Sequence, residues 1–354
     1  MYATSPIKAE ETLVSYPTKQ NIALSDEFDY GKSDNFHYRY AHTVTMEISK
    51  GKDSEYAAYF MNLETMEEVK GNSCFFYDQE DLDLIKKMNI VLFNKVMEFR
   101  QSIHHSIDVI SKIDASIDQD TLLRVLLNMN SRSWGQLGFL PIFELFNHSD
   151  LKGITLRSME KGSKLGYVSR LDYQPGEQVF VAYNHQDMYH YAISFNYFDP
   201  TGSHFIDAAW RTKQQARTDF EKEVFKLTSQ KHKLHYQQVN DAISYQLKDA
   251  DTFFLDTAPN ANQINYIRNN CMQTPAELQA GVGNDSSFDK RLLEILGFLL
   301  HVNNIDAFTL KDVPEKLHRF YHMLKKEKQM LEANKRWVFL NSKDYIIDPD
   351  LAHL

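Results

Sequence analysis

The stretch that decides how this sequence is interpreted is Ser131–Asp150, SRSWGQLGFLPIFELFNHSD. An apolar run at residues 139–143 precedes the polar triplet Asn147-His148-Ser149. Polar side chains placed directly after a buried segment are available to bind a ligand. The same pattern is also typical of a capped turn whose histidine is satisfied by hydrogen bonds within the protein. Taken alone, the stretch leaves both interpretations open.

The residues before this stretch change from strand-like to helical. Thr12–Tyr16 (TLVSY) is rich in residues typical of strands and is stopped by Pro17. From about residue 40 to 130 the pattern is helical, with one apolar stripe running from Leu82 to Ile103 at steps of three and four. Asp78 stands at the expected N-cap of that stripe. A further helix is predicted over residues 119–129.

The residues after it return to short strands and then become helical. Pro175-Gly176 predicts a turn, and Gln178–Tyr183 (QVFVAY) predicts a buried strand. Beyond about residue 205 the apolar spacing is helical almost throughout. Strands, a helical block, strands and a helical tail in this order indicate an α+β protein whose β-rich core is interrupted by helices.

Three segments carry a resemblance to a known family. They are Ser131-Arg132-Ser133-Trp134, then Pro141–Ser149 (PIFELFNHS), then Pro175–Tyr183 (PGEQVFVAY). In this order they resemble the SET-domain methyltransferases, in the branch of the RuBisCO large-subunit methyltransferase and the actin-histidine methyltransferase. The family pattern has Asp where this chain has Glu144, and it often has Gly where this chain has Asn184.

The resemblance implies a fold and a division into domains. It implies an α+β fold with a β-rich SET core at residues 1–204 and a helical subdomain inserted at about 40–130. It also implies that an all-α, substrate-binding domain of the RuBisCO-methyltransferase type follows at residues 205–354.

The resemblance further implies a cofactor, S-adenosyl-L-methionine, and the residues that contact it. Asn147 and His148 would hold the cofactor through main-chain and amide hydrogen bonds. Arg132 would pair with its carboxylate, because a planar, two-pronged cation suits that group. Tyr2 and Ala3 would lie beside it at the start of the SET core. Read without the family, Arg132 is equally suited to an ion pair within the protein.

Four residues are expected to handle the substrate. Tyr183 would be the catalytic tyrosine, whose hydroxyl orients the attacking amine, although a tyrosine at the end of a buried strand can also simply pack. Trp134, Glu144 and Phe146 would line the substrate pocket, where aromatic faces favour a cation. Trp134 is also suited to the core.

The resemblance leaves the target residue and the activity open. Protein lysine N-methylation is the leading hypothesis, because lysine-modifying relatives tend to carry an aromatic residue where this chain has Trp134, and the actin-histidine type carries an asparagine. Protein-histidine methylation is the second hypothesis. A non-catalytic SET-fold binding module is the third. It is motivated by a Gly-x-Gly segment that the family has just before the position of Tyr2, since this sequence begins after that position. The absence of this Gly-x-Gly segment has three possible explanations, which are a missing N-terminus, weaker cofactor binding and lost activity.

Composition and charge restrict the classes of partner that this protein is expected to bind. The chain has 354 residues and a net charge of −9, which disfavours non-specific binding to nucleic acid. It has no apolar run long enough to cross a bilayer, so we expect no membrane segment. Its two cysteines are too few for a disulfide framework or a thiolate zinc cluster, so no metal is expected. These features predict a cytoplasmic or nuclear protein that acts on a protein substrate. The sequence gives no signal of oligomeric state.

Overall fold

The structure is a computed structural model of the whole chain. It describes residues 1–17, 22, 24, 28–30, 35–148, 154, 156–169, 171–181, 187–198, 206–207, 254–255, 293 and 296–341. The chain divides into two compact units. Unit 1 comprises Met1–Tyr77, Val96–His185 and Ile193–Tyr197, and unit 2 comprises Asp78–Lys95, Gln186–Ala192 and Phe198–Leu354. The units do not divide at a single point in the chain, and the domain boundary at residue 204 stays a prediction.

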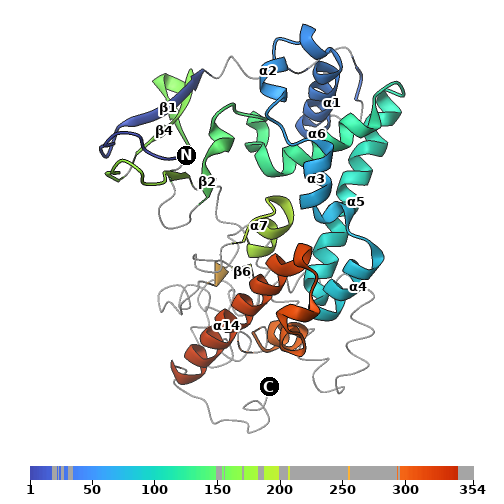
Figure 1. Cartoon of the computed structure of the whole chain (residues 1–354), viewed down its shortest axis with the longest axis vertical. Coiled ribbons are helices and arrows are strands. Elements are labelled where there is room, and N and C mark those ends of the chain that lie inside the picture. Colours follow the sequence, from blue (N-terminus) through green and yellow to red (C-terminus); the bar gives the residue numbers. More distant parts are fainter. Residues whose placement is uncertain are drawn as a thin grey trace, which may run out of the picture. The chain divides into compact units, whose positions relative to one another are not determined.

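The strands of unit 1 form two small sheets (Figure 1). The first is antiparallel, has the order β1-β4-β3 and pairs Val14 of β1 and Leu156 of β3 with Tyr167 of β4. The second pairs β2 with β5 in parallel. The strands of unit 1 are β1 (Thr12–Pro17), β2 (Asn147–His148), β3 (Leu156–Met159), β4 (Lys164–Val168) and β5 (Phe180–Val181). The predicted strand at residues 12–16 is therefore present.

Between β1 and β2 the described chain is mainly helical. The α-helices there are α1 (Phe36–Ser49), α2 (Ala57–Phe60), α3 (Met66–Asn72), α4 (Gln79–Met88), α5 (Ile90–Ile113) and α6 (Gln119–Arg132). Short 3₁₀ turns join them or follow α6, at Gly51–Asp53, Cys74–Phe76, Gly135–Leu137 and Phe143–Leu145. Helix α1 packs against α6 (Figure 1). The side chains of Asn35, Thr65 and Asp118 begin α1, α3 and α6, respectively, as N-caps.

The predicted stripe from Leu82 to Ile103 forms two helices, not one. Helix α4 ends at Met88 and α5 begins at Ile90, because Asn89 is extended, with φ −162° and ψ 116°. The Asn89 side chain then accepts a hydrogen bond from the Leu92 amide at 3.0 Å, as an N-cap does. Asp78 is the N-cap of α4, as predicted.

Unit 1 contains two groups of buried apolar side chains. One joins the helices and includes Tyr40, Ile103, Leu126 and Phe139. The other lies around the strands and includes Leu140, Phe143, Tyr167 and Val181. The two groups meet in sequence at Phe139 and Leu140, just before the residues of the predicted site.

Unit 2 is described mainly by helices. They are most of α7 (Met188–Ser194), α4, and α14 (His318–Asn341), which is preceded by 3₁₀ turns at Ile305–Ala307, Leu310–Asp312 and Glu315–Leu317. The short strands β6 (Ile206–Asp207) and β7 (Phe254–Leu255) pair antiparallel. Glu327 of α14 is buried, and it accepts hydrogen bonds from the Tyr189 hydroxyl at 3.0 Å and from the Asn303 amide at 2.8 Å. Among the helices that the structure describes, none is both long and apolar enough to span a bilayer.

Candidate active site

The N-terminal segment lies against the Gly-Glu-Gln segment. The Ala3 amide donates to the Glu177 carbonyl at 2.9 Å, and the Gly176 amide donates to the Ala3 carbonyl at 2.8 Å. Tyr2 forms an antiparallel bridge with Gln178. Gly176 stands in the turn with φ +87°, a conformation that favours glycine. Tyr2 and Ala3, predicted to lie beside the cofactor, are thus fixed to the segment that leads into β5.

The parallel pairing of β2 with β5 connects that segment to the Asn-His motif. Asn147 pairs with Phe180 and His148 with Val181. The Asn147 side chain is exposed, whereas His148 is buried and its ring meets the Tyr197 ring at a centroid distance of 6.4 Å. Tyr183, predicted to be catalytic, lies outside the described residues, as do Ser149 and Ala182.

The predicted aromatic pocket residues meet at Tyr167. The ring centroid of Tyr167 lies 6.0 Å from that of Trp134 and 5.2 Å from that of Phe146. Phe143 completes the group at 4.8 Å. Phe146 is 5% exposed and belongs to the core, whereas Trp134 is half-buried. Of the two, Trp134 is therefore the more accessible to a ligand.

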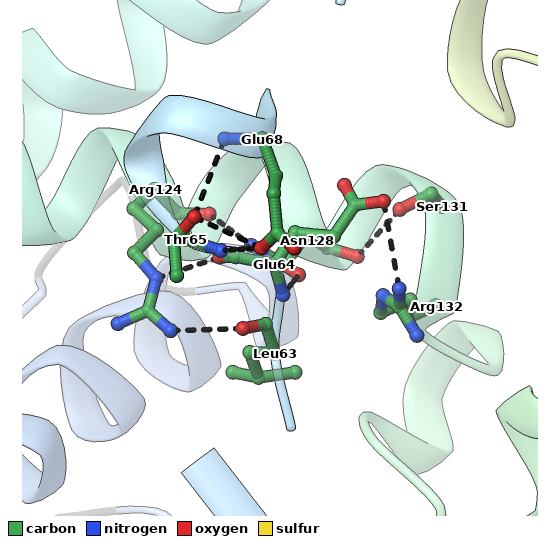
Figure 2. A network of polar contacts seen from close by, with 8 residues as sticks. All are labelled: Leu63, Glu64, Thr65, Glu68, Arg124, Asn128, Ser131 and Arg132. Carbon is green, nitrogen blue, oxygen red and sulfur yellow. Dashed lines mark hydrogen bonds and ion pairs between the residues drawn. The ribbon is translucent and has the colours of Figure 1, made fainter. Parts of the chain in front are cut away.

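Arg132 is held by a polar network on one face of α6 (Figure 2). Arg124, Asn128 and Arg132 follow one another at steps of four and so share that face. The Arg124 guanidinium donates to the Glu64 carbonyl at 2.7 Å, and Asn128 both donates to that carbonyl and accepts from the Glu64 amide. These contacts place the Glu64 carboxylate 3.5 Å from Nη2 of Arg132. The ion pair that the sequence left open for Arg132 is present.

The Arg132 side chain keeps hydrogen-bonding capacity beyond that ion pair. Its Nε is buried and has no hydrogen-bond partner in the described structure. A distance of 3.5 Å is also longer than the 2.7–2.9 Å typical of a charge-assisted hydrogen bond. A carboxylate ligand can therefore bind this guanidinium without removing a strong hydrogen bond.

Glu144 lies in a half-buried position near Arg132 and Tyr59. Burial raises the pKa of Glu144, while its contact with Tyr59 and the charge of Arg132 lower it. Oε2 of Glu144 and the Tyr59 hydroxyl are both buried without a hydrogen bond of standard geometry. Burial and the neighbouring Glu144 also raise the pKa of Tyr59, which keeps its hydroxyl protonated.

The backbone just before Glu144 is strained. Ile142 has φ +76°, which is unfavourable for a β-branched residue, and its side chain is 48% exposed. Such strain is concentrated at functional sites, where the surrounding structure holds it in place. Among the described residues, no three His, Cys, Asp or Glu side chains come together as metal ligands.

The segments described above lie within a region that matches a family model. The SET domain model matches residues 1–184, which is more than half of the chain. This chain belongs to the SET-domain family. No curated protein sequence matches it.

Solved structures of SET domains are similar to this one. The SET domain of LSMT bound to MeLysine and AdoHcy is similar, with a TM-score of 0.56 and 13% identity. Rubisco LSMT bound to sinefungin and monomethyllysine has a TM-score of 0.56 and 13% sequence identity to this chain. Rubisco LSMT bound to AdoMet has a TM-score of 0.55 and 13% identity. Each covers 100% of this chain and 86% of the other. At this identity the likeness establishes the fold.

The described structure places the predicted residues in three groups. Tyr2 and Ala3 are linked through the Gly-Glu-Gln segment and β5 to Asn147 and His148. Arg132 and Glu144 interact electrostatically, and Trp134 and Phe146 both pack on Tyr167.

Sequence reasoning missed Glu64 and Tyr59. The polar residues at steps of four on α6 were a signal that a polar segment packs there. No pattern in the sequence pointed to Tyr59.

Proposed function

We propose that this SET domain is an S-adenosylmethionine-dependent protein methyltransferase that modifies lysine. The observation that carries the proposal is the pairing of β2 with β5, since it sets the Asn147-His148 pair beside the strand that leads to Tyr183. Membership of the SET-domain family supports the reaction class. The similar structures bound to AdoMet, AdoHcy and methylated lysine support the cofactor and the target.

The residues present fit the cofactor. Asn147 presents an exposed side-chain amide, which both donates and accepts hydrogen bonds. Arg132 has a buried Nε with no hydrogen-bond partner, which suits one oxygen of the cofactor carboxylate. His148 would contribute mainly through its backbone, because its side chain is buried. Tyr2 would contribute its exposed side chain, and Ala3, whose amide and carbonyl already bond residues 177 and 176, would contact the cofactor by packing. When bound, S-adenosylmethionine supplies an electrophilic methyl group on a sulfonium.

The chain's own residues would align the target amine and favour its neutral form. Methyl transfer is an in-line displacement, so the amine must be held collinear with the methyl group and the sulfur. Tyr183 would orient the amine through its hydroxyl. Lysine has an ordinary pKa of about 10.4, and an apolar environment lowers it, which favours the neutral nucleophile. Trp134 and Phe146, both packed on Tyr167, would supply that environment.

Other features of the proposal concern the whole chain. We propose that the helical C-terminal domain, residues 205–354, presents the protein substrate. We also propose a cytoplasmic or nuclear location for the reaction. We prefer lysine to histidine as the modified residue because position 134 is aromatic, Trp134, as it tends to be in the lysine-modifying enzymes that the sequence resembles.

Calorimetry with S-adenosylmethionine tests the cofactor site. The wild type should bind the cofactor, and Arg132→Ala should weaken binding about tenfold or more, as for a charge-assisted hydrogen bond. Methylthioadenosine lacks the amino-acid end of the cofactor, so its affinity should be nearly equal in both proteins. Equal loss for the two ligands would contradict the assignment of Arg132. If the wild type bound neither ligand, the result would favour the hypothesis of a non-catalytic binding module over that of an enzyme.

A further inference from the structure

The backbone and the side chain of Glu64 make separate contacts. The Glu64 amide donates to Oδ1 of Asn128 at 3.0 Å, and the Glu64 carbonyl accepts from the side chains of Arg124 and Asn128 at 2.7 Å and 3.1 Å. These three hydrogen bonds use backbone atoms of Glu64 and fix the residue to α6 (Figure 2). The carboxylate takes no part in them and faces Arg132. The fold therefore places this carboxylate without using it to join the helices.

The ion pair between Glu64 and Arg132 is accessible and has room for a ligand. Oε1 of Glu64 lies 3.5 Å from Nη2 of Arg132, which is longer than a charge-assisted hydrogen bond. The Arg132 and Glu64 side chains are 21% and 32% exposed, respectively. Nε of Arg132 is buried and has no hydrogen-bond partner among the residues that the structure describes. The pair thus presents a positive and a negative group side by side, each with hydrogen-bonding capacity left.

The surroundings of Arg132 do not favour a simple anion. Besides its ion pair with Glu64, the guanidinium interacts electrostatically with Glu144 and Glu68, and Arg124 is a second cation beside Glu68. Even when Glu144 is protonated, the carboxylates of Glu64 and Glu68 balance the two guanidinium groups. A simple anion would therefore meet no net positive charge in this group of residues. A ligand that carries both signs of charge would be complementary to it.

A zwitterionic α-amino acid group has the form that this ion pair requires. Its ammonium nitrogen and carboxyl carbon are both bonded to one carbon atom, so they lie about 2.5 Å apart. Its two charges therefore stay adjacent, as those of Arg132 and Glu64 do. An ammonium group only donates hydrogen bonds and an ionised carboxylate only accepts them, so each end of the ligand can pair with one member of the ion pair and not with the other.

We propose that Glu64 binds the α-ammonium group of the methyl donor while Arg132 binds its α-carboxylate. The inference rests on the proposed function, because it concerns the cofactor assigned to this site. It adds to the site a residue from the segment between α2 and α3, and it makes the site selective for a donor that has its amino group. A residue that only held Arg132 in place would act on the carboxylate alone. A residue that competed for Arg132 would weaken binding of the donor.

Calorimetry with three ligands on the full chain tests this inference. S-adenosylhomocysteine carries the whole amino-acid end, its deamino analogue has hydrogen in place of the α-amino group, and methylthioadenosine lacks the amino-acid end. The wild type should bind S-adenosylhomocysteine at least threefold more tightly than the deamino analogue. Glu64→Gln should weaken S-adenosylhomocysteine about three- to tenfold, an effect between that of an exposed ion pair and that of a hydrogen bond to a charged group. The same variant should bind the deamino analogue as well as the wild type does, or slightly better.

Matched variants and the third ligand are the controls. Glu64→Gln keeps the backbone contacts of Glu64, so its affinity for methylthioadenosine should change less than twofold. Glu67→Gln and Glu160→Gln, each at an exposed carboxylate, should change all three affinities less than twofold. Arg132→Ala, in contrast, should weaken both ligands that carry a carboxylate.

The alternatives give different results. Equal weakening of S-adenosylhomocysteine and its deamino analogue in Glu64→Gln would mean that Glu64 only positions Arg132. Tighter binding of both would mean that Glu64 competes with the cofactor. Either result, or an unchanged affinity for S-adenosylhomocysteine, would overturn the inference and leave the proposed function standing. If the wild type binds none of the three ligands, the proposed function fails and the inference fails with it.

Discussion

Replacing Gly138 by alanine should strongly destabilise unit 1. Gly138 has φ 68° and ψ −147°, a region that is open almost only to glycine. A Cβ there would lie 2.5 Å from the Tyr40 hydroxyl oxygen and closer still to the ring carbon Cζ. The Tyr40 ring cannot swing away without breaking its hydrogen bond to the Phe139 amide.

The size of the effect follows from two terms. The backbone conformation costs alanine about 1–3 kcal/mol, and forcing the ring aside costs about 1–3 kcal/mol more. Gly138→Ala should therefore lower the free energy of unfolding by about 2–6 kcal/mol. Gly51→Ala is the control, because Gly51 also has a positive φ, of 59°, but a Cβ there would meet nothing within 4 Å. Gly51→Ala should lower the free energy of unfolding by only about 1–2 kcal/mol.

Urea unfolding followed by circular dichroism measures both variants against the wild type. The expected result is a clearly lower midpoint for Gly138→Ala than for Gly51→Ala, with similar slopes. Equal midpoints for the two variants would refute the reasoning, because they would mean that the Tyr40 ring does not press on this position.

Three further predictions concern the caps and polar pairs. Asp118→Ala should lower the free energy of unfolding by about 1 kcal/mol at pH 7 through loss of the α6 cap. Hydrogen bonds from Thr121 lower the pKa of Asp118, so its contribution is present above about pH 4 and is lost as the pH falls through the folded-state value. The two proteins should then unfold alike near pH 2. Tyr189→Phe should lower the free energy of unfolding, measured by thermal unfolding, by about 1–3 kcal/mol, because buried Glu327 loses a hydrogen-bond donor. Asp306→Asn should lower the free energy of unfolding by less than about 1 kcal/mol in the same assay, because its ion pairs with lysine are exposed to solvent. This small effect is expected even though the lysine partners lower the pKa of Asp306 to about 2.

Local features of the fold could be predicted from the sequence. The strand predicted at Thr12–Tyr16 and the N-cap at Asp78 follow from residue types and their immediate neighbours. Both are confirmed, and the strand extends by one residue to Pro17. The break at Asn89 was not predicted, because Met88 and Leu92 keep the apolar spacing across it. Periodicity alone does not detect an interruption of one residue.

The candidate site could be predicted only in part. The Asn147-His148 motif and Arg132 are recognisable because their spacing resembles a family pattern. Contacts such as Glu64 with Arg132, or Tyr59 with Glu144, join residues far apart in the chain, so no local pattern encodes them. They depend on how the helical region packs against the strands, which is set by the whole core.

Methyl transfer from labelled S-adenosylmethionine to proteins of a cell extract tests the central claim most directly. Wild type is compared with Tyr183→Phe and Asn147→Ala, with Glu160→Gln as the control. The account predicts a labelled protein band whose label lies on lysine, is lost in Asn147→Ala, is reduced in Tyr183→Phe and is unchanged in Glu160→Gln. Label on histidine would contradict the lysine assignment. No label from a protein that binds no cofactor would contradict the enzyme itself.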